Sequence, residues 1–320
     1  MNAFQPRPFG HSGLLVSSLA YGAMSITADP GIAAGVAPSL LRALERGVNL
    51  IDTARIYPGS EALVRSSLAA WRGPRPLIST KLQTRCLDAW RFPHPLHEAY
   101  TPASIRQSVD ESLAALGVET LDIVHLHQWH YGWTHEPDWL ETLQALRREG
   151  KLRCIAVSAQ DHEHDALLEL VSRRMVDGIQ LIVNLFESRP LNAVLPLAEA
   201  RGVGVIGRCV MDSGGLAGGL GREDFAARRF LQHAPYDEYR RRLDRMEAAL
   251  CPQHAGSLAE LALRFAAFAP GVSSITLGTS TAAWVDQALA VLDKGPLAQE
   301  AVRLIAREHV WSKNFYEELL

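Results

Sequence analysis

The sequence has few cysteines, and they do not form a recognisable pattern. Cys86, Cys154, Cys209 and Cys251 are far apart among the 320 residues, and no two of them make a CxxC pair. A zinc ribbon or a dense disulfide framework is therefore not indicated. We expect the four thiols to be reduced and mostly buried.

The sequence also lacks an excess of one charge and a long apolar run. Lys and Arg number 32 against 35 Asp and Glu, a net charge of −3, and like charges do not collect into a basic stripe. Nucleic acid is therefore not an expected partner. No stretch approaches the roughly 18 uninterrupted apolar residues of a membrane span, and the first residues show no apolar core behind a basic head. We expect a cytoplasmic protein without a membrane partner.

Short apolar runs alternate with longer amphipathic segments along the chain. The longer segments, such as Pro102–Leu116, Asp138–Glu149 and Leu191–Arg201, repeat apolar residues at three- and four-residue spacing, which is typical of helices. The short runs are predicted strands: Ser17–Gly22, Val48–Asp52, Pro76–Lys81, Leu121–His127, Leu152–Ser158, Gly178–Val183, Gly202–Gly207 and Val272–Leu277. Strands that alternate with helices in this way predict a parallel sheet.

The alternation predicts one (β/α)₈ TIM barrel that forms a single domain over residues 1–320. It continues from near residue 17 to residue 293 without a low-complexity linker. The segment Arg7–Val16, with a turn at residues 11–13, predicts an N-terminal β-hairpin at the barrel floor. Met211–Pro235 and Pro296–Leu320 exceed the minimal repeat, so we expect extra helices and long loops, including loops at the C-terminal face.

Polar residues lie at or just after the C-terminal ends of the predicted strands, where TIM barrels have their active sites. Asp52, Lys81 and His127 each end a strand, and Tyr57 follows in the loop after Asp52. A phenol has a pKa of about 10, and a neighbouring ammonium lowers that pKa by favouring phenolate. We therefore expect Lys81 to tune Tyr57 as a general acid and base, with Asp52 pairing Lys81. The His127 imidazole can orient a substrate oxygen.

The chain resembles the aldo-keto reductase family in several motifs that occur in the family's order. IDTARIYPGSEALVRSSL followed by LISTKL is similar to that family's Asp-Thr-Ala-x-x-Tyr-x-x-Ser-Glu motif and its lysine strand. LDIVHLH resembles the histidine strand, and GKLRCIAVS resembles the Gly-Lys-x-Arg-x-x-Gly-x-Ser strand. IQLIVNLF resembles the Gln-x-x-x-Asn strand, and VSSITLGTS resembles the family's last strand, which is associated with the cofactor phosphate. The resemblance covers nearly the whole chain.

This resemblance implies an NAD(P)(H)-dependent oxidoreductase that acts on a carbonyl compound or a secondary alcohol. The family's catalytic tetrad falls on Asp52, Tyr57, Lys81 and His127. The nicotinamide carboxamide would be held by Ser158 and Gln180, and Arg208 takes the place where many members stack a tyrosine on the nicotinamide. Further positions match family contacts to the cofactor phosphates: Gly214, Leu216, Gly278, Thr279 and Ser280.

The chain departs from the family pattern near the adenine end of the cofactor. Ala159 stands where an asparagine often follows the serine, and Gln287 and Ala288 stand where the family has Glu-Asn. Trp284 occupies the position at which NADPH-preferring relatives often place an arginine that could fork onto the 2′-phosphate. Either NADPH or NADH therefore remains open as the cofactor.

Several alternatives stay open from the residues alone. His125 and His127 share a face of one strand and could ligate a metal, although packing or hydrogen bonding is the expected role of His125, and no metal site is assigned. Trp129 either contacts substrate or packs the loop against the rim. The fold could also serve a cofactor-binding regulatory module or, least favoured, a metal-dependent hydrolase. The substrate stays open among sugars, sugar-like intermediates and natural-product carbonyls, as does the oligomeric state.

Overall fold

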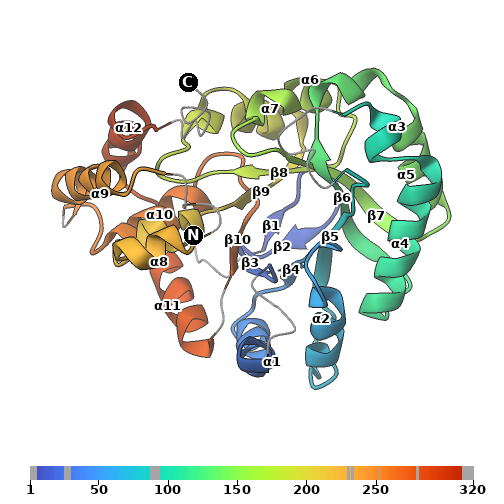
Figure 1. Ribbon diagram of the computed structural model, residues 1–320, viewed down its shortest axis with the longest axis horizontal. Coiled ribbons are helices and arrows are strands. Elements are labelled where there is room, and N and C mark those ends of the chain that lie inside the picture. The colour runs from blue at the N-terminus through green and yellow to red at the C-terminus, as the bar shows by residue number, and fades with distance from the viewer. Residues whose placement is uncertain are drawn as a thin grey trace.

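Parallel strands close into a barrel in the computed structural model, which describes residues 6–24, 30–86, 94–228, 231, 234–251, 253–278 and 281–311 (Figure 1). The strands are β3 (Leu19–Gly22), β4 (Leu50–Asp52), β5 (Leu77–Leu82), β6 (Leu121–Trp129), β7 (Leu152–Ala159), β8 (Gly178–Ile182), β9 (Gly204–Arg208) and β10 (Ser274–Gly278). Each strand pairs with the next, and β10 closes the ring by pairing with β3. The predicted TIM-barrel fold is confirmed.

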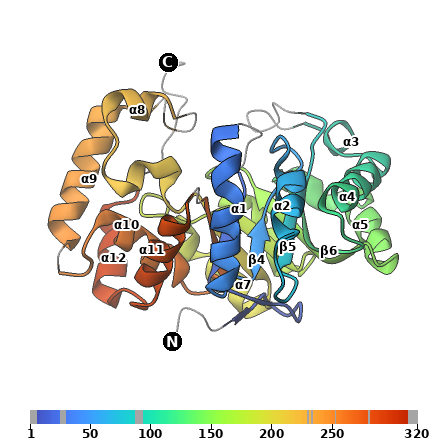
Figure 2. The same cartoon turned by 90° about the horizontal axis from the view of Figure 1, so that it is seen from below.

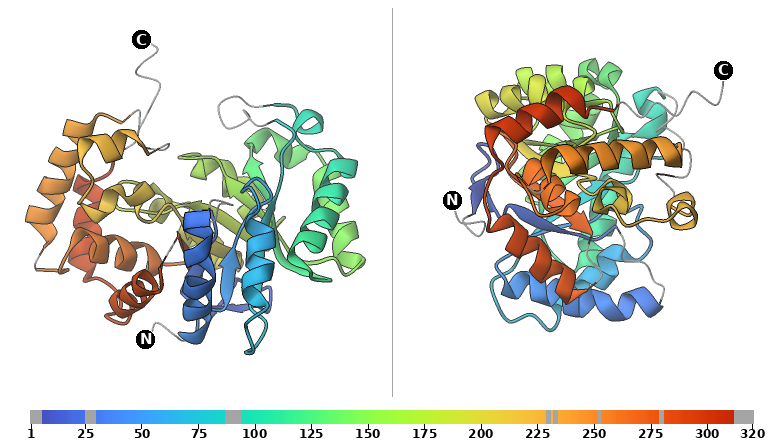
Figure 3. Two further views of the ribbon diagram at one scale, coloured as in Figure 1. Left: turned by 60° about the horizontal axis from the view of Figure 1, so that its bottom comes forward. Right: turned by 90° about the vertical axis from the view of Figure 1, so that its left-hand side faces the viewer.

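Helices surround this barrel on its outside (Figure 1). The α-helices are α1 (Pro30–Glu45), α2 (Ser60–Leu68), α3 (Leu96–Ala99), α4 (Pro102–Leu116), α5 (Asp138–Arg148), α6 (Leu168–Ser172), α7 (Val194–Arg201), α8 (Arg222–Ala226), α9 (Tyr236–Leu250), α10 (Leu258–Ala267), α11 (Ala282–Leu292) and α12 (Gln299–Glu308). Short 3₁₀ turns are η1 (Tyr131–His135), η2 (His164–Leu167), η3 (Arg189–Asn192) and η4 (Asp212–Ala217). Figure 3 shows α8, α9, α10 and α12 gathered on one side of the barrel.

Helix α4 illustrates how local sequence sets an element's bounds. Thr101 and Ser104 form a reciprocal capping box, which satisfies N–H groups that the first helical turn leaves without partners. Pro102 occupies the first turn, where its missing N–H is tolerated. The helix ends at Leu116 and is followed by Gly117, whose φ of 68° is a left-handed conformation that favours glycine. These signals agree with the predicted helix.

Alternation along the strands divides the core into two parts. One set of side chains fills the barrel interior: Phe9, Leu14, Val16, Ala20, Leu50, Ile123, Cys154, Ala156 and Ile206. The other set packs the outer face of the sheet against the helices, as Ile51 and Val124 do. Because neighbouring residues of a strand point to opposite faces, the position two residues beyond an interior side chain also faces inward.

A hairpin of β1 (Arg7–Pro8) and β2 (Leu15–Val16) covers one end of the barrel. Figure 2 shows it at the opposite end from α3 and α8. The Phe9 ring is fully buried and lies so close to Gly178 and Gly204 that a Cβ at either glycine would approach ring atoms to 2.3 Å and 2.4 Å, respectively. The predicted floor hairpin is confirmed, and it leaves the end that carries α3 and α8 as the mouth.

The helices and the cysteines bear on what the composition predicts. Within the described ranges, the helices are all too short or too polar to cross a membrane. The four cysteines are free thiols, but only Cys154 is buried, while Cys86, Cys209 and Cys251 are partly exposed. The prediction that the cysteines are mostly buried is therefore wrong, because three of them lie in loops or at element ends.

Candidate active site

The interior face of the strands leads from the apolar floor to polar residues at the mouth. In β4, Asp52 lies two residues beyond the interior Leu50, and in β6, His125 and His127 continue the face of the interior Ile123. Lys81 is paired in register with His125 across β5 and β6. The strand pattern therefore brings the acid, the amine and the imidazoles to one region.

Lys81 and Asp52 form a buried ion pair. The Lys81 Nζ atom lies 2.9 Å from Asp52 Oδ2 and donates a second hydrogen bond to the Thr53 carbonyl at 2.8 Å. Burial acts to raise the pKa of Asp52, but the charge of Lys81 and its hydrogen bond hold that pKa below its usual value. Burial also lowers the pKa of Lys81, which Asp52 opposes. The charged form of each residue is therefore stabilised by the charge of the other.

His125 completes this cluster from the adjacent strand. The Ser79 hydroxyl donates to Asp52 Oδ1 at 2.8 Å and lies 3.0 Å from His125 Nε2. His125 is fully buried, and burial lowers its pKa to about 4, so the ring is neutral at pH 7. The hydrogen bond to Ser79 agrees with the packing and hydrogen-bonding role expected for His125. Ser79 lies on the same strand face as Lys81, two residues earlier, and this spacing was the signal that could have revealed it.

Tyr57 reaches the cluster from the loop between β4 and α2. Its ring centroid lies 5.9 Å from that of His127 with the rings perpendicular, and 5.5 Å from Lys81 Nζ. The structure thus brings together all four residues of the predicted tetrad. Burial lowers the pKa of His127 to about 3, and the charge of Lys81 acts in the same direction. His127 is therefore a neutral hydrogen-bonding group at pH 7.

The pKa of Tyr57 is raised rather than lowered. Burial is the largest cause, and the negative charge of Asp52 adds to it. The cation that opposes this rise is Arg208, whereas the charge of Lys81 is offset by Asp52. The expectation that Lys81 lowers the Tyr57 pKa does not match this arrangement, because the carboxylate lies in the same cluster. Tyr57 is accordingly a protonated phenol at neutral pH.

Ser158 and Gln180 lie side by side on β7 and β8. They are register partners and both are buried. Neither the side-chain oxygen nor the nitrogen of Gln180 has a hydrogen-bond partner within the described chain. A buried amide without partners is costly, so this one is suited to a bound group that both donates and accepts hydrogen bonds. A carboxamide is such a group, as the resemblance to the family implied.

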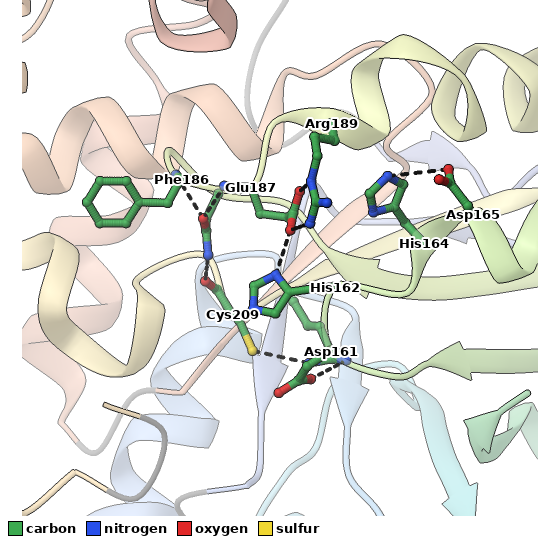
Figure 4. A network of polar contacts seen from close by, with 10 residues as sticks. Asp161, His162, His164, Asp165, Phe186, Glu187, Arg189 and Cys209 are labelled. Atoms are coloured by element: carbon green, nitrogen blue, oxygen red, sulfur yellow. Dashed lines mark hydrogen bonds and ion pairs between the residues drawn. The ribbon is translucent and has the colours of Figure 1, made fainter. Parts of the chain in front are cut away.

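Arg208 ends β9, on the same face as Ile206, which pairs in register with Gln180. Its Nη2 atom donates to the Ala159 carbonyl at 2.9 Å and lies 2.8 Å from Asp161 Oδ1. Its Nη1 atom lies 3.3 Å from the sulfur of Cys209. Asp161 and Cys209 are close neighbours in Figure 4. Sequence reasoning missed Asp161, because nothing in the spacing shows that the loops after β7 and β9 meet.

A second buried carboxylate ties the loop after β7 to the segment after β8. Glu187 accepts hydrogen bonds from His162 Nδ1 at 2.5 Å and Arg189 Nε at 2.6 Å (Figure 4). Burial acts to raise the Glu187 pKa, but these hydrogen bonds lower it to about 2. Asn184 adds a bond from its Nδ2 to the Cys209 carbonyl at 2.9 Å. The three loops beside Gln180 are therefore fastened to one another.

The structure describes some of the predicted phosphate-binding positions, but not all of them. The N–H groups of Gly214 and Leu216 both donate to the Met211 carbonyl, so that in this structure they hold the η4 turn together. Gly214 has a φ of 92°, which requires glycine. Gly278 ends β10, whereas Thr279 and Ser280 lie outside the described residues.

The two predicted adenine-side residues lie on α11. Trp284 is 55% exposed and lies in the first turn of α11, which Thr281 caps, and Gln287 is exposed one turn further on. Both side chains are therefore available to a ligand at this end of the barrel. Neither one carries a positive charge.

Trp129 is placed as a packing residue. It is buried, its ring lies 5.0 Å from that of Trp139, and its Nε1 atom donates to the Ala166 carbonyl at 3.1 Å. Its indole N–H is thus engaged within the chain, and its ring is buried against other aromatic side chains. This placement favours the packing alternative over substrate contact, and we make no substrate assignment to Trp129 below.

Comparisons with known proteins agree with this geometry. A model of the Aldo/keto reductase family matches residues 18–308. The L-galactose dehydrogenase of Arabidopsis thaliana is 26% identical over 302 residues, covering 91% of this chain and 89% of the relative. The NADH-specific methylglyoxal reductase of Escherichia coli K12 is 26% identical over 237 residues, covering 68% and 70%.

Solved structures give the same result. The glycerol dehydrogenase of Gluconobacter oxydans has a TM-score of 0.75 at 26% identity, covering 97% of each chain. An aldo-keto reductase of Bacillus halodurans has a TM-score of 0.77 at 24% identity, covering 97% of this chain and 99% of that one, and so matches in fold. A barrel with these relatives is an oxidoreductase of carbonyl and alcohol groups. The chain belongs to the aldo/keto reductase family and depends on NAD(P)H.

Proposed function

We propose that this enzyme interconverts a carbonyl and an alcohol with Tyr57 as the proton donor and acceptor. The observation that carries the proposal is the position of the Tyr57 ring, beside the neutral His127 imidazole and the Lys81 ammonium. A phenol with a raised pKa stays protonated at neutral pH, so it can pass its proton to the developing alkoxide oxygen. In the reverse direction the same oxygen accepts the proton.

The other residues have distinct roles in this proposal. His127 is neutral and can donate a hydrogen bond to the carbonyl oxygen, which orients it toward the Tyr57 hydroxyl. Lys81 and Asp52 form a fixed pair of charges behind Tyr57. Fixed charges and dipoles stabilise negative charge on oxygen without having to reorganise during the reaction. Ser79 holds Asp52 in place through its hydrogen bond.

Ser158 and Gln180 would hold the nicotinamide carboxamide. The fit rests on the buried Gln180 amide, which has an oxygen and a nitrogen ready for a ligand. When bound, the nicotinamide supplies or accepts the hydride. Backbone and side-chain groups near Gly214, Leu216, Gly278, Thr279, Ser280 and Gln287 are proposed to contact the rest of the dinucleotide, on the family resemblance alone.

We further propose weak discrimination between NADPH and NADH. No arginine stands at Trp284, and two cations elsewhere are already engaged: Arg264 bonds Glu260, His254 and the Gly295 carbonyl, and Lys294 lies 2.5 Å from Glu260. A charge-assisted contact to a phosphate is about twice as strong as a neutral one. With Arg264 and Lys294 engaged and a tryptophan at position 284, the 2′-phosphate gains little from these three described positions.

The substrate is proposed to be a small polar carbonyl compound or its alcohol. The relatives support this class, because their names give L-galactose, methylglyoxal and glycerol as the compounds on which they act. The test is cofactor-linked turnover of purified protein with a panel of aldehydes, ketones, lactols and secondary alcohols, followed by nicotinamide absorbance. Cofactor binding without turnover of any panel member would favour the regulatory alternative and contradict the proposed chemistry.

A further inference from the structure

Arg208 is a fixed cation beside the place proposed for the nicotinamide. Its side chain is only 17% exposed, and two of its guanidinium nitrogens are held by the Ala159 carbonyl, Asp161 and Cys209. Ala159 directly follows Ser158, and the residue two before Arg208 on the same strand face pairs in register with Gln180. The guanidinium and the Ser158–Gln180 pair therefore share one stretch of the rim.

Asp161 is the acidic partner of this cation. Its Oδ1 atom lies 2.8 Å from Arg208 Nη2, and its side chain is 53% exposed toward solvent. The pair places one positive and one negative charge at the rim, with the positive charge on the buried side. An arginine keeps its charge at all relevant pH values, so the local field depends on whether the carboxylate is there to offset it.

The oxidised nicotinamide ring carries a positive charge, whereas the reduced ring is neutral. A nearby cation therefore disfavours the oxidised form and leaves the reduced form almost unaffected. A carboxylate paired with that cation reduces the effect. We propose that Arg208 and Asp161 together set the relative affinity of the enzyme for oxidised and reduced cofactor, with Asp161 acting as a counter-charge through Arg208. This proposal rests on the proposed nicotinamide site.

Arg208 and Asp161 should have opposite effects on the ratio between the dissociation constants of the oxidised and the reduced cofactor. Asp161→Asn keeps the guanidinium but removes its counter-charge, so the dissociation constant of the oxidised cofactor should rise about tenfold relative to that of the reduced cofactor. That change corresponds to about 1.4 kcal/mol. Arg208→Gln removes the cation, so the ratio should move in the opposite direction. Asp161→Glu keeps the charge and should restore the wild-type ratio.

The experiment measures the dissociation constants of both cofactor forms by calorimetry and by reduced-nicotinamide fluorescence. The matched control is Glu149→Gln, which removes a single ion pair between Glu149, at the C-terminal end of α5, and Arg106 of α4. A merely structural role of Asp161 would weaken both cofactor forms together and leave their ratio unchanged. An unchanged ratio in Asp161→Asn, or a ratio that moves as in Arg208→Gln, would overturn the proposal.

The same measurements separate this proposal from the proposed function. Wild-type protein that binds neither form of the cofactor would contradict the nicotinamide site itself. Wild-type protein that binds both forms, with a ratio insensitive to Asp161, would contradict only the counter-charge. Because Asp161 is half exposed and lies in a loop, its replacement should leave folding intact, which far-ultraviolet circular dichroism would check.

Discussion

Replacing Lys81 by methionine should destabilise the fold severely. Lys81 is 1% exposed, and its ammonium is the ion-pair partner of the buried Asp52 carboxylate at 2.9 Å. Methionine fills much of the same space but leaves the carboxylate without its counter-charge. Removing one partner of a buried pair costs about 3–5 kcal/mol, a large part of a total stability of about 5–15 kcal/mol. We therefore expect the free energy of unfolding to fall by that amount.

The assay is urea unfolding followed by circular dichroism, with two companion variants. Lys151→Met removes a partly exposed lysine that pairs with Asp110 at the surface, and it should cost at most about 1 kcal/mol. The double variant Lys81→Met with Asp52→Asn leaves no uncompensated charge and should recover part of the loss. A loss below about 1 kcal/mol for Lys81→Met alone would refute the reasoning that the pair is buried and mutually dependent.

The same variant should change the pH dependence of any remaining activity. Without Lys81, the negative charge of Asp52 would act on Tyr57 with less opposition, and the phenol pKa would rise further. The alcohol-oxidising direction needs the phenolate, so its rate should reach a plateau only at higher pH. An unchanged pH–rate profile in an active Lys81→Met enzyme would contradict the electrostatic coupling.

The remaining predictions concern the acid, the interior histidine and the cofactor. Tyr57→Phe should lower kcat at least about 10²-fold with nearly unchanged cofactor affinity, and undiminished turnover would show that Tyr57 is not the acid. His125 has a pKa of about 4 because it is buried, so the unfolded state gains a proton below about pH 6.5 that the folded state excludes. Wild-type protein should lose about 2 kcal/mol more stability than His125→Gln between pH 7 and pH 5 in urea unfolding, and equal losses would count against this linkage. The dissociation constants of NADPH and NADH should differ by less than about a hundredfold, and a larger NADPH preference would mean that a cation reads the 2′-phosphate.

The sequence pattern was sufficient to predict the barrel and most strand positions. The remaining differences have local causes. The predicted strand at residues 202–207 begins later, at Gly204, because Gly202 is the left-handed end of α7. The predicted helix at residues 191–201 is broken at Ala193, whose φ of −140° separates η3 from α7. Periodicity reports which residues face inward but not where backbone dihedral angles change.

The site was predicted where it depends on strand ends and was missed where it depends on loops. Asp52, Lys81 and His127 lie on strands, so alternation alone places them together. Asp161 and Glu187 lie in loops after strands, and their partners are set by how these loops fold over the mouth. Trp129 was ambiguous for the same reason, since its burial depends on packing against Trp139.

The floor of the barrel also has a consequence for the order of assembly. Phe9 belongs to one of the first segments of the chain to be synthesised, but the ring rests against Gly178 and Gly204, which lie far along the sequence. A chain leaves the ribosome from its N-terminus onward, so the surface against which the Phe9 ring packs is incomplete until β9 has emerged. Contacts between such distant positions close large loops, and loop closure slows folding. The hairpin is therefore an early segment whose docking we expect among the late steps of folding.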